Sequence, residues 1–117
     1  MHEGQAVRQI VAAIAAALRP YRDGTPTRVT VRIGQLRRLQ LESVRWHYAV
    51  CTRGTPLEHV ALDVEMVPAV VRCGNCGWQG AVADAELPFC SACRMAAVHV
   101  LSGREITVAA VELASGS

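Results

Sequence analysis

Two short cysteine motifs constrain the fold of this chain more than any other feature. Cys73-Gly-Asn-Cys76 and Cys90-Ser-Ala-Cys93 are separated by thirteen residues. Two intervening residues let the chain turn and direct both sulfurs at one ion, and two such motifs complete a tetrahedral sulfur shell. Because four thiolates leave no position open for water, the spacing predicts a structural zinc ion bound by Cys73, Cys76, Cys90 and Cys93.

Two other interpretations of the cysteines are open. A tetrahedron of four sulfurs also suits iron, which is the minority alternative to zinc. A redox-active dithiol is less favoured, because it would leave the second motif without a role. The cysteine segment is too short for a real hydrophobic core. We therefore expect zinc to supply most of its stability, on the order of 10–16 kcal/mol at neutral pH.

Composition and charge limit the remaining function classes. The chain has 117 residues, which fits one compact domain or a domain with a small lobe. Of these residues 51% are hydrophobic, which is enough for a core and argues against disorder. The formal charge of +2 counts every cysteine as neutral. Four thiolates and one Zn²⁺ together cancel that charge, which weakens a nucleic-acid interpretation based on net charge.

The length of the apolar segments and the first residues of the chain predict where the protein is located. No apolar run reaches the roughly 18 residues needed to span a bilayer, and residues 10–18 form the most apolar stretch. The chain opens with Met-His-Glu-Gly, which has an acid where a secretory signal carries basic residues. We expect a cytoplasmic protein that does not associate with membranes.

Periodicity predicts an α+β fold of two helices on a three-stranded sheet, with an inserted zinc-ribbon-like lobe of four cysteines. Apolar residues at helical spacing predict helices over 4–19 and 42–53. Alternation predicts strands over 27–33, 60–67 and 104–113, the last with Ile106, Val108 and Ala110 inward. We expect one lobe from residues 1–70 plus 102–117, and a zinc lobe from 71–101. Cys51 is predicted to be a buried small hydrophobe on the second helix.

The sequence carries no sign of an enzyme. It has no phosphate-binding GxxxxGK[ST] loop, no paired carboxylates in a recognisable motif and no open metal site. We therefore expect any nucleotide hydrolysis to belong to a partner protein.

The first residues, Met1, His2 and Glu3, have the chemistry of a second metal site. The terminal amine and the His2 amide nitrogen close a five-membered chelate ring, and that amide and the His2 Nδ1 atom close a six-membered ring. The Glu3 amide, the Glu3 carboxylate or a distant imidazole would complete a square, a geometry that favours Ni(II) or Cu(II). His99, just past the second cysteine motif, is one such imidazole. An exposed or locally hydrogen-bonded side chain is the favoured interpretation of His99. A surface or boundary position is predicted for His47.

The order of these features resembles the HypA/HybF family of hydrogenase-maturation proteins. The resemblance covers nearly the whole chain: MHE at the start, GTPLEHVALDVEMVP before the first cysteine motif, the second motif, and a closing GREITVAAVEL. It implies a nickel metallochaperone for [NiFe]-hydrogenase, with His2 as the most directly matching nickel ligand, Glu3 beside it, and the four cysteines as zinc ligands.

The same resemblance implies two partners, the GTPase of the maturation pathway and the hydrogenase large subunit. A homodimer is left open. The alternative class is a zinc-ribbon module that binds nucleic acid or protein. For nucleic acid it would need a basic stripe and aromatic side chains, and the zinc segment has few basic residues.

Overall fold

Two three-stranded sheets organise the chain. The computed structural model describes all residues except 1, 83–88, 97 and 115–117, and it leaves the side chain of His2 undescribed. The chain divides into two compact units. We call residues 1–32, 39–65 and 106–117 the helical unit, and residues 33–38 and 66–105 the cysteine unit.

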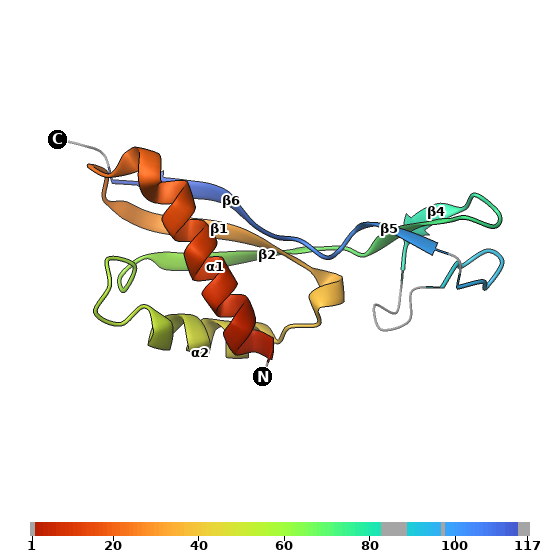
Figure 1. The fold of residues 1–117 in the computed structure, drawn as a ribbon, viewed down its shortest axis with the longest axis horizontal. Helices are drawn as coiled ribbons and strands as arrows, with labels where there is room; N and C mark the ends of the chain where they lie inside the picture. Colours follow the sequence, from red (N-terminus) through yellow and green to blue (C-terminus); the bar gives the residue numbers. More distant parts are fainter. Residues whose placement is uncertain (1, 83–88, 97, 115–117) are drawn as a thin grey trace. The chain divides into compact units, whose positions relative to one another are not determined.

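The helical unit is built around a sheet in the order β2-β1-β6. These strands are β1 (Pro26–Gly34), β2 (Ala61–Val67) and β6 (Ile106–Leu113), and Figure 1 shows β1 between its two neighbours. β1 alternates as expected, with Val29, Val31 and Ile33 buried. Arg28, just before Val29, points to the other face and pairs with Asp63 of β2 at 2.5 Å. The central strand therefore separates an apolar face from a charged one.

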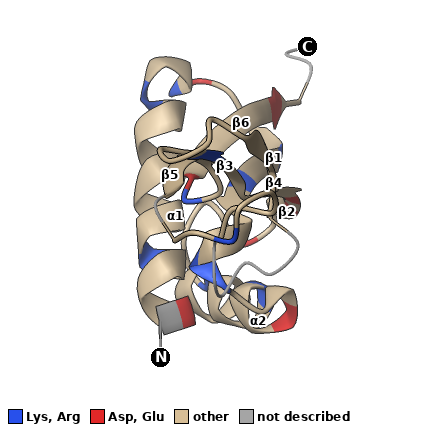
Figure 2. Cartoon of the chain, turned by 90° about the vertical axis from the view of Figure 1, so that its right-hand side faces the viewer, with Lys and Arg blue, Asp and Glu red and all other residues tan. Residues whose placement is uncertain are grey.

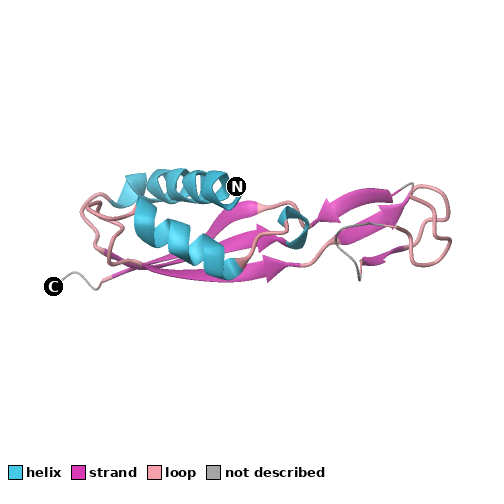
Figure 3. Cartoon of the chain, turned by 90° about the horizontal axis from the view of Figure 1, so that it is seen from below, coloured by secondary structure: helices cyan, strands magenta, loops and turns pink. Residues whose placement is uncertain are grey.

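Two helices cover one face of this sheet (Figure 3). They are α1 (His2–Leu18) and α2 (Leu41–Cys51), close to the predicted 4–19 and 42–53. α1 buries Val7, Ile10 and Ile14 at the helical spacing read from the sequence. Short 3₁₀ turns follow α1 and β1, as η1 (Arg19–Tyr21) and η2 (Gln35–Arg37). No helix in the described part of the chain is long and apolar enough to cross a membrane.

Two burial predictions in the helical unit are wrong. Cys51 is exposed, because the buried stripe of α2 runs through Val44 and Tyr48 to Thr52, four residues apart, and Cys51 falls beside it. On β6, Ala110 is exposed like Ala109 before it, so strict alternation fails at this pair and the half-buried positions resume at Val111.

The cysteine unit contains its own antiparallel sheet in the order β4-β3-β5. The strands are β3 (Val70–Cys73), β4 (Gln79–Ala81) and β5 (Val98–Ser102), none of which was predicted individually. Ala69, Val71 and Val82 are its buried core, with four partly buried side chains packed against them. So small a core supports the expectation that a metal stabilises this unit. The α+β prediction, with a separate four-cysteine lobe, is confirmed.

Within the cysteine unit, two backbone segments pass very close to each other at Gly34. A Cβ atom added to Gly34 would lie 2.0 Å from the carbonyl carbon of Gly103. The Gly34 N–H donates to the Glu105 carbonyl at 2.7 Å, and the Leu36 N–H donates to the Gly103 carbonyl at 2.8 Å. Only glycine fits at position 34, and Gly103 itself has a φ of 116°.

Candidate metal centre

The two cysteine motifs fold into the same local structure. Two backbone N–H groups, from the residues two and three positions further on, donate to the Sγ atom of Cys73 at 3.3 and 3.4 Å. The Sγ atom of Cys90 accepts the two equivalent bonds, each at 3.3 Å. Such bonds favour the thiolate over the thiol, because an N–H donor stabilises negative charge on sulfur. Each motif therefore presents a sulfur prepared to bind a cation.

Each motif is closed by a residue with left-handed backbone. The N–H of Gly77 donates to the Cys73 carbonyl at 3.0 Å, and that of Arg94 donates to the Cys90 carbonyl at 2.9 Å. Gly77 has a φ of 81° and Arg94 a φ of 65°. The repeat in sequence is thus a repeat in structure, although the second motif has arginine where the first has glycine.

The four sulfurs converge on one point. The Sγ atoms of Cys73 and Cys93 are 3.7 Å apart, those of Cys76 and Cys90 are 3.5 Å apart, and all four lie within 4.8 Å of one another. With a Zn–S bond of about 2.3 Å, a regular tetrahedron has S–S edges of about 3.8 Å. The donor set and its spacing therefore fit zinc. The separations are also far longer than a disulfide bond of about 2.05 Å.

Without a metal, the thiols of Cys73, Cys76 and Cys90 do not ionise alike. The N–H donor of Cys76 is the main cause that lowers the pKa of Cys73. Burial opposes ionisation of Cys90, but the N–H donors of Cys93 and Ala92 and the neighbouring thiols outweigh it and lower the pKa to about 6. The N–H of Trp78 favours the Cys76 thiolate, yet the surrounding thiols and burial prevail and raise the pKa to about 12. A full set of thiolates thus requires a cation at the centre.

The N-terminal candidates lie at the start of α1. Met1 is outside the described residues, and His2 is the first residue of the helix. The first four N–H groups of a helix have no partner within it, so the His2 and Glu3 amides are not used by helix hydrogen bonds. The Glu3 Oε2 atom lies 3.5 Å from the backbone nitrogen of Gln40, the N-cap of α2. The Glu3 carboxylate is thereby placed at the positive end of the second helix.

Two further histidines and two arginines lie on different elements of the structure. His99 is exposed on β5, opposite Arg72, as favoured from the sequence. His47 is half-buried on α2, as expected of a boundary residue. Arg37 and Arg45 donate to backbone carbonyls at 2.7 and 2.8 Å, and so stabilise the fold.

Positive charge is not concentrated along one element. In Figure 2 the basic and acidic segments are interspersed over the helices, strands and loops that it draws. The basic stripe that a nucleic-acid-binding ribbon would need is not seen in that view.

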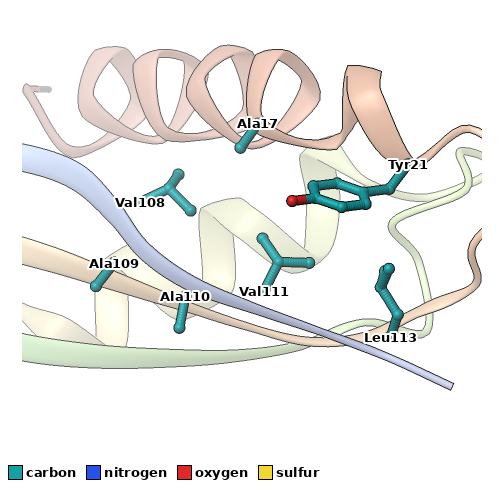
Figure 4. Close-up of a pocket in the computed structure, with 7 residues that line it drawn as sticks. All are labelled: Ala17, Tyr21, Val108, Ala109, Ala110, Val111 and Leu113. Atoms are coloured by element: carbon teal, nitrogen blue, oxygen red, sulfur yellow. The ribbon is translucent and has the colours of Figure 1, made fainter. Parts of the chain in front are cut away.

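An open groove beside α1 and β6 offers no metal chemistry. Its volume is about 320 Å³, and Figure 4 shows Ala17, Val108 and Val111 directed into the space beside the Tyr21 ring. The residues that line it include no carboxylate, imidazole or thiol. Among the described residues, the four cysteines are the one group of side chains that could hold a metal ion. The N-terminal candidates fall on Met1 and on the His2 side chain, which lie outside the described part.

Known proteins match this chain over nearly its whole length. Residues 1–113 match the family model described as hydrogenase/urease nickel incorporation, metallochaperone, hypA. The hydrogenase maturation factor HypA of Desulfosudis oleivorans is 33% identical over 115 residues, covering 97% of this chain and 98% of that protein. HypA of Chlorobium limicola is 33% identical over 116 residues, covering 99% of each chain.

Solved structures share the fold. The solution structure of the Ni metallochaperone HypA from Helicobacter pylori superposes with a TM-score of 0.70 at 16% identity, over 95% of this chain and 96% of that one. A second solution structure of a HypA protein gives a TM-score of 0.67 at 17% identity, covering 99% and 98% of the two chains. The family match over nearly the whole length, together with the cysteine cluster and the α+β fold, shows that the chain belongs to the HypA family of nickel-incorporation metallochaperones.

Proposed function

We propose that this protein binds Ni(II) through Met1, His2 and Glu3 and delivers it during maturation of [NiFe]-hydrogenase. The observation that carries the proposal is the match of residues 1–113 to a family model for nickel incorporation. The protein acts as a carrier without turnover of its own, in the cytoplasm. Its partners are the GTPase of the maturation pathway, which supplies nucleotide hydrolysis, and the hydrogenase large subunit.

The start of α1 suits a site that must both hold and release a metal. The terminal amine, the His2 amide and the His2 imidazole form two fused chelate rings, and nitrogen donors in a plane favour nickel over zinc. The site is at the end of the chain, so an acceptor reaches the metal without unfolding the core. Because helix ends fray, the first turn adjusts to the chelate at small cost.

Zinc has a separate and structural role in this proposal. Cys73, Cys76, Cys90 and Cys93 hold it in a closed thiolate shell, which leaves no coordination position for cargo. The zinc lobe comprises residues 71–101, and residues 1–70 plus 102–117 form the nickel-binding lobe. The small core of the cysteine unit explains why the metal is needed.

A titration of Ni(II) into three zinc-loaded proteins tests the nickel site. The proteins are the native chain, His2→Ala, and a version with extra residues before Met1, which converts the terminal amine to an amide. We expect the native chain to bind one Ni(II), and both variants to lose at least about tenfold in affinity, because an imidazole or an amine ligand is removed. Affinity should also fall below pH 7.7–8.0, since the amine then holds its proton.

The outcome that contradicts the site is equal affinity in all three proteins. Nickel would then bind elsewhere on the chain. His59→Ala is a suitable control, because the His59 side chain is 92% exposed and lies in a loop. Its affinity should match that of the native chain.

A further inference from the structure

We propose that His47 of α2 supplies a further nitrogen ligand to the nickel ion bound at the start of α1. This inference rests on the proposed N-terminal nickel site and identifies a donor that the local chelate does not contain. No sequence pattern indicates His47, because the residues it approaches are more than forty positions away in the chain.

The structure places the His47 ring against the first turn of α1. A methyl group added to Gly4 would lie 3.5 Å from the Cδ2 atom and 3.6 Å from the Nε2 atom of His47. Because Gly4 has no side chain, nothing on that residue separates the ring edge from the helix backbone. His2 precedes Gly4 by two residues, about 3 Å along a helix axis. The imidazole and the backbone of the first residues of α1 therefore lie at the same end of the helix pair.

The orientation of the ring leaves the correct nitrogen for a metal. The His47 Nδ1 atom lies 2.8 Å from the Ser43 carbonyl oxygen, one turn earlier on α2. A carbonyl only accepts hydrogen bonds, so Nδ1 carries the proton and Nε2 keeps its lone pair in the neutral ring. Histidines that bind metals commonly donate their other N–H to a backbone carbonyl in this way. The Trp46 ring meets the imidazole edge-on, with centroids 4.9 Å apart, and further limits its rotation.

The Glu3 carboxylate is already engaged nearby, which favours the imidazole as the additional donor. Glu3 Oε2 lies 3.5 Å from the backbone nitrogen of Gln40, where it also meets the N-terminal dipole of α2. The contact holds the starts of the two helices together. Imidazole is also a better ligand for Ni(II) than carboxylate oxygen in a site of nitrogens. Nickel bound to both His2 and His47 would bridge α1 and α2.

The test compares Ni(II) affinity in zinc-loaded native protein, His47→Ala, His47→Gln, His2→Ala and the control His59→Ala. We expect both His47 variants to bind nickel at least tenfold more weakly and His59→Ala to match the native chain. His47→Gln keeps a polar side chain of similar reach, so it serves if the alanine variant folds poorly. Circular dichroism of each metal-free variant verifies the helices.

A spectroscopic readout separates a ligand from a packing residue. In NMR spectra of the imidazole nitrogens, the Nε2 signal of His47 should move or vanish on addition of Ni(II) to the native chain, and stay unchanged in His2→Ala. Gly4→Ala gives an independent test, because its methyl group would sit against Nε2 without a clash. We expect it to preserve the helix and weaken nickel binding.

The possible failures are distinguishable. Nickel binding that is lost in His2→Ala but unchanged in both His47 variants, with an unmoved Nε2 signal, would overturn this inference alone. Equal binding by the native chain and His2→Ala would overturn the proposed N-terminal site and this inference with it.

Discussion

At the scale of single residues, Cys76 and Cys90 of the two cysteine motifs ionise at very different pH. The pKa of Cys90 is lowered to about 6, so this thiol is ionised at neutral pH. The pKa of Cys76 is raised to about 12, so Cys76 holds its proton until a cation arrives. Zinc binding must therefore displace at least the Cys76 proton.

This difference predicts how zinc affinity depends on pH. Between pH 7 and 8 we expect zinc binding to release at least about one proton, and affinity to rise about tenfold per pH unit for each proton released. Below pH 6 the dependence steepens, because Cys90 is then protonated as well and must also lose its proton. Calorimetric zinc titrations in buffers of different ionisation enthalpy measure the proton count directly.

Cys51→Ser is the matched control for that titration. Cys51 is exposed and lies outside the two motifs, so its replacement should change neither the affinity nor the proton count. Zinc binding without proton release at pH 7 would contradict the assigned ionisation of Cys76.

The positions of individual side chains were predictable from the sequence only where local spacing determines them. The clustering of the four cysteines was predictable, because two residues between the cysteines of each motif fix the local geometry. The exposure of Cys51 was not predictable, because a shift of one residue along a helix decides whether a side chain contacts the core. The position of His47 against Gly4 depends on how two helices pack, which no local pattern encodes.

At the scale of elements, the segment around Gly34 depends on the absence of a side chain. A Cβ atom there would lie 2.0 Å from backbone atoms of Gly103, which cannot retreat as a flexible side chain would. We predict that Gly34→Ala lowers the free energy of unfolding by about 3 kcal/mol or more, as strong overpacking does. Denaturant unfolding of the native chain and the variant in the presence of excess zinc measures this loss of free energy.

Gly54→Ala separates this steric effect from backbone strain. Gly54 has a φ of 73°, but an added Cβ atom would meet nothing within 4 Å. Its replacement should cost only about 1–2 kcal/mol, the penalty for a left-handed residue. Equal losses in the two variants would show that contact with Gly103 is not what restricts position 34.

The boundaries of α1, α2 and β1 followed from periodicity, because one face of each is buried. β2 was also predicted within one residue, although Leu62 is its one buried side chain. Periodicity did not predict the strands or the inward positions where side chains are only partly buried. The three strands of the cysteine unit have three to five residues each, which is too short for a clear alternating pattern. On β6 the consecutive exposed pair Ala109 and Ala110 breaks the alternation from which the inward positions were predicted.

At the scale of the whole molecule, the two proposed metals have different tasks. The sulfur shell belongs to a unit that has little core of its own. In the proposal, nickel is held at the N-terminal residues by nitrogens that an acceptor can replace. The order of the two helices and three strands of the helical unit was predictable from the sequence, but the strand order β2-β1-β6 was not, because it depends on contacts between distant segments.

The most direct test of the central claim is the amount of nickel that reaches the hydrogenase large subunit in cells lacking their own HypA protein. We predict that the native chain and His59→Ala restore nickel incorporation. The version extended before Met1 should retain one zinc per chain and fail to restore it. Full nickel incorporation with the extended version would contradict delivery from the N-terminal site.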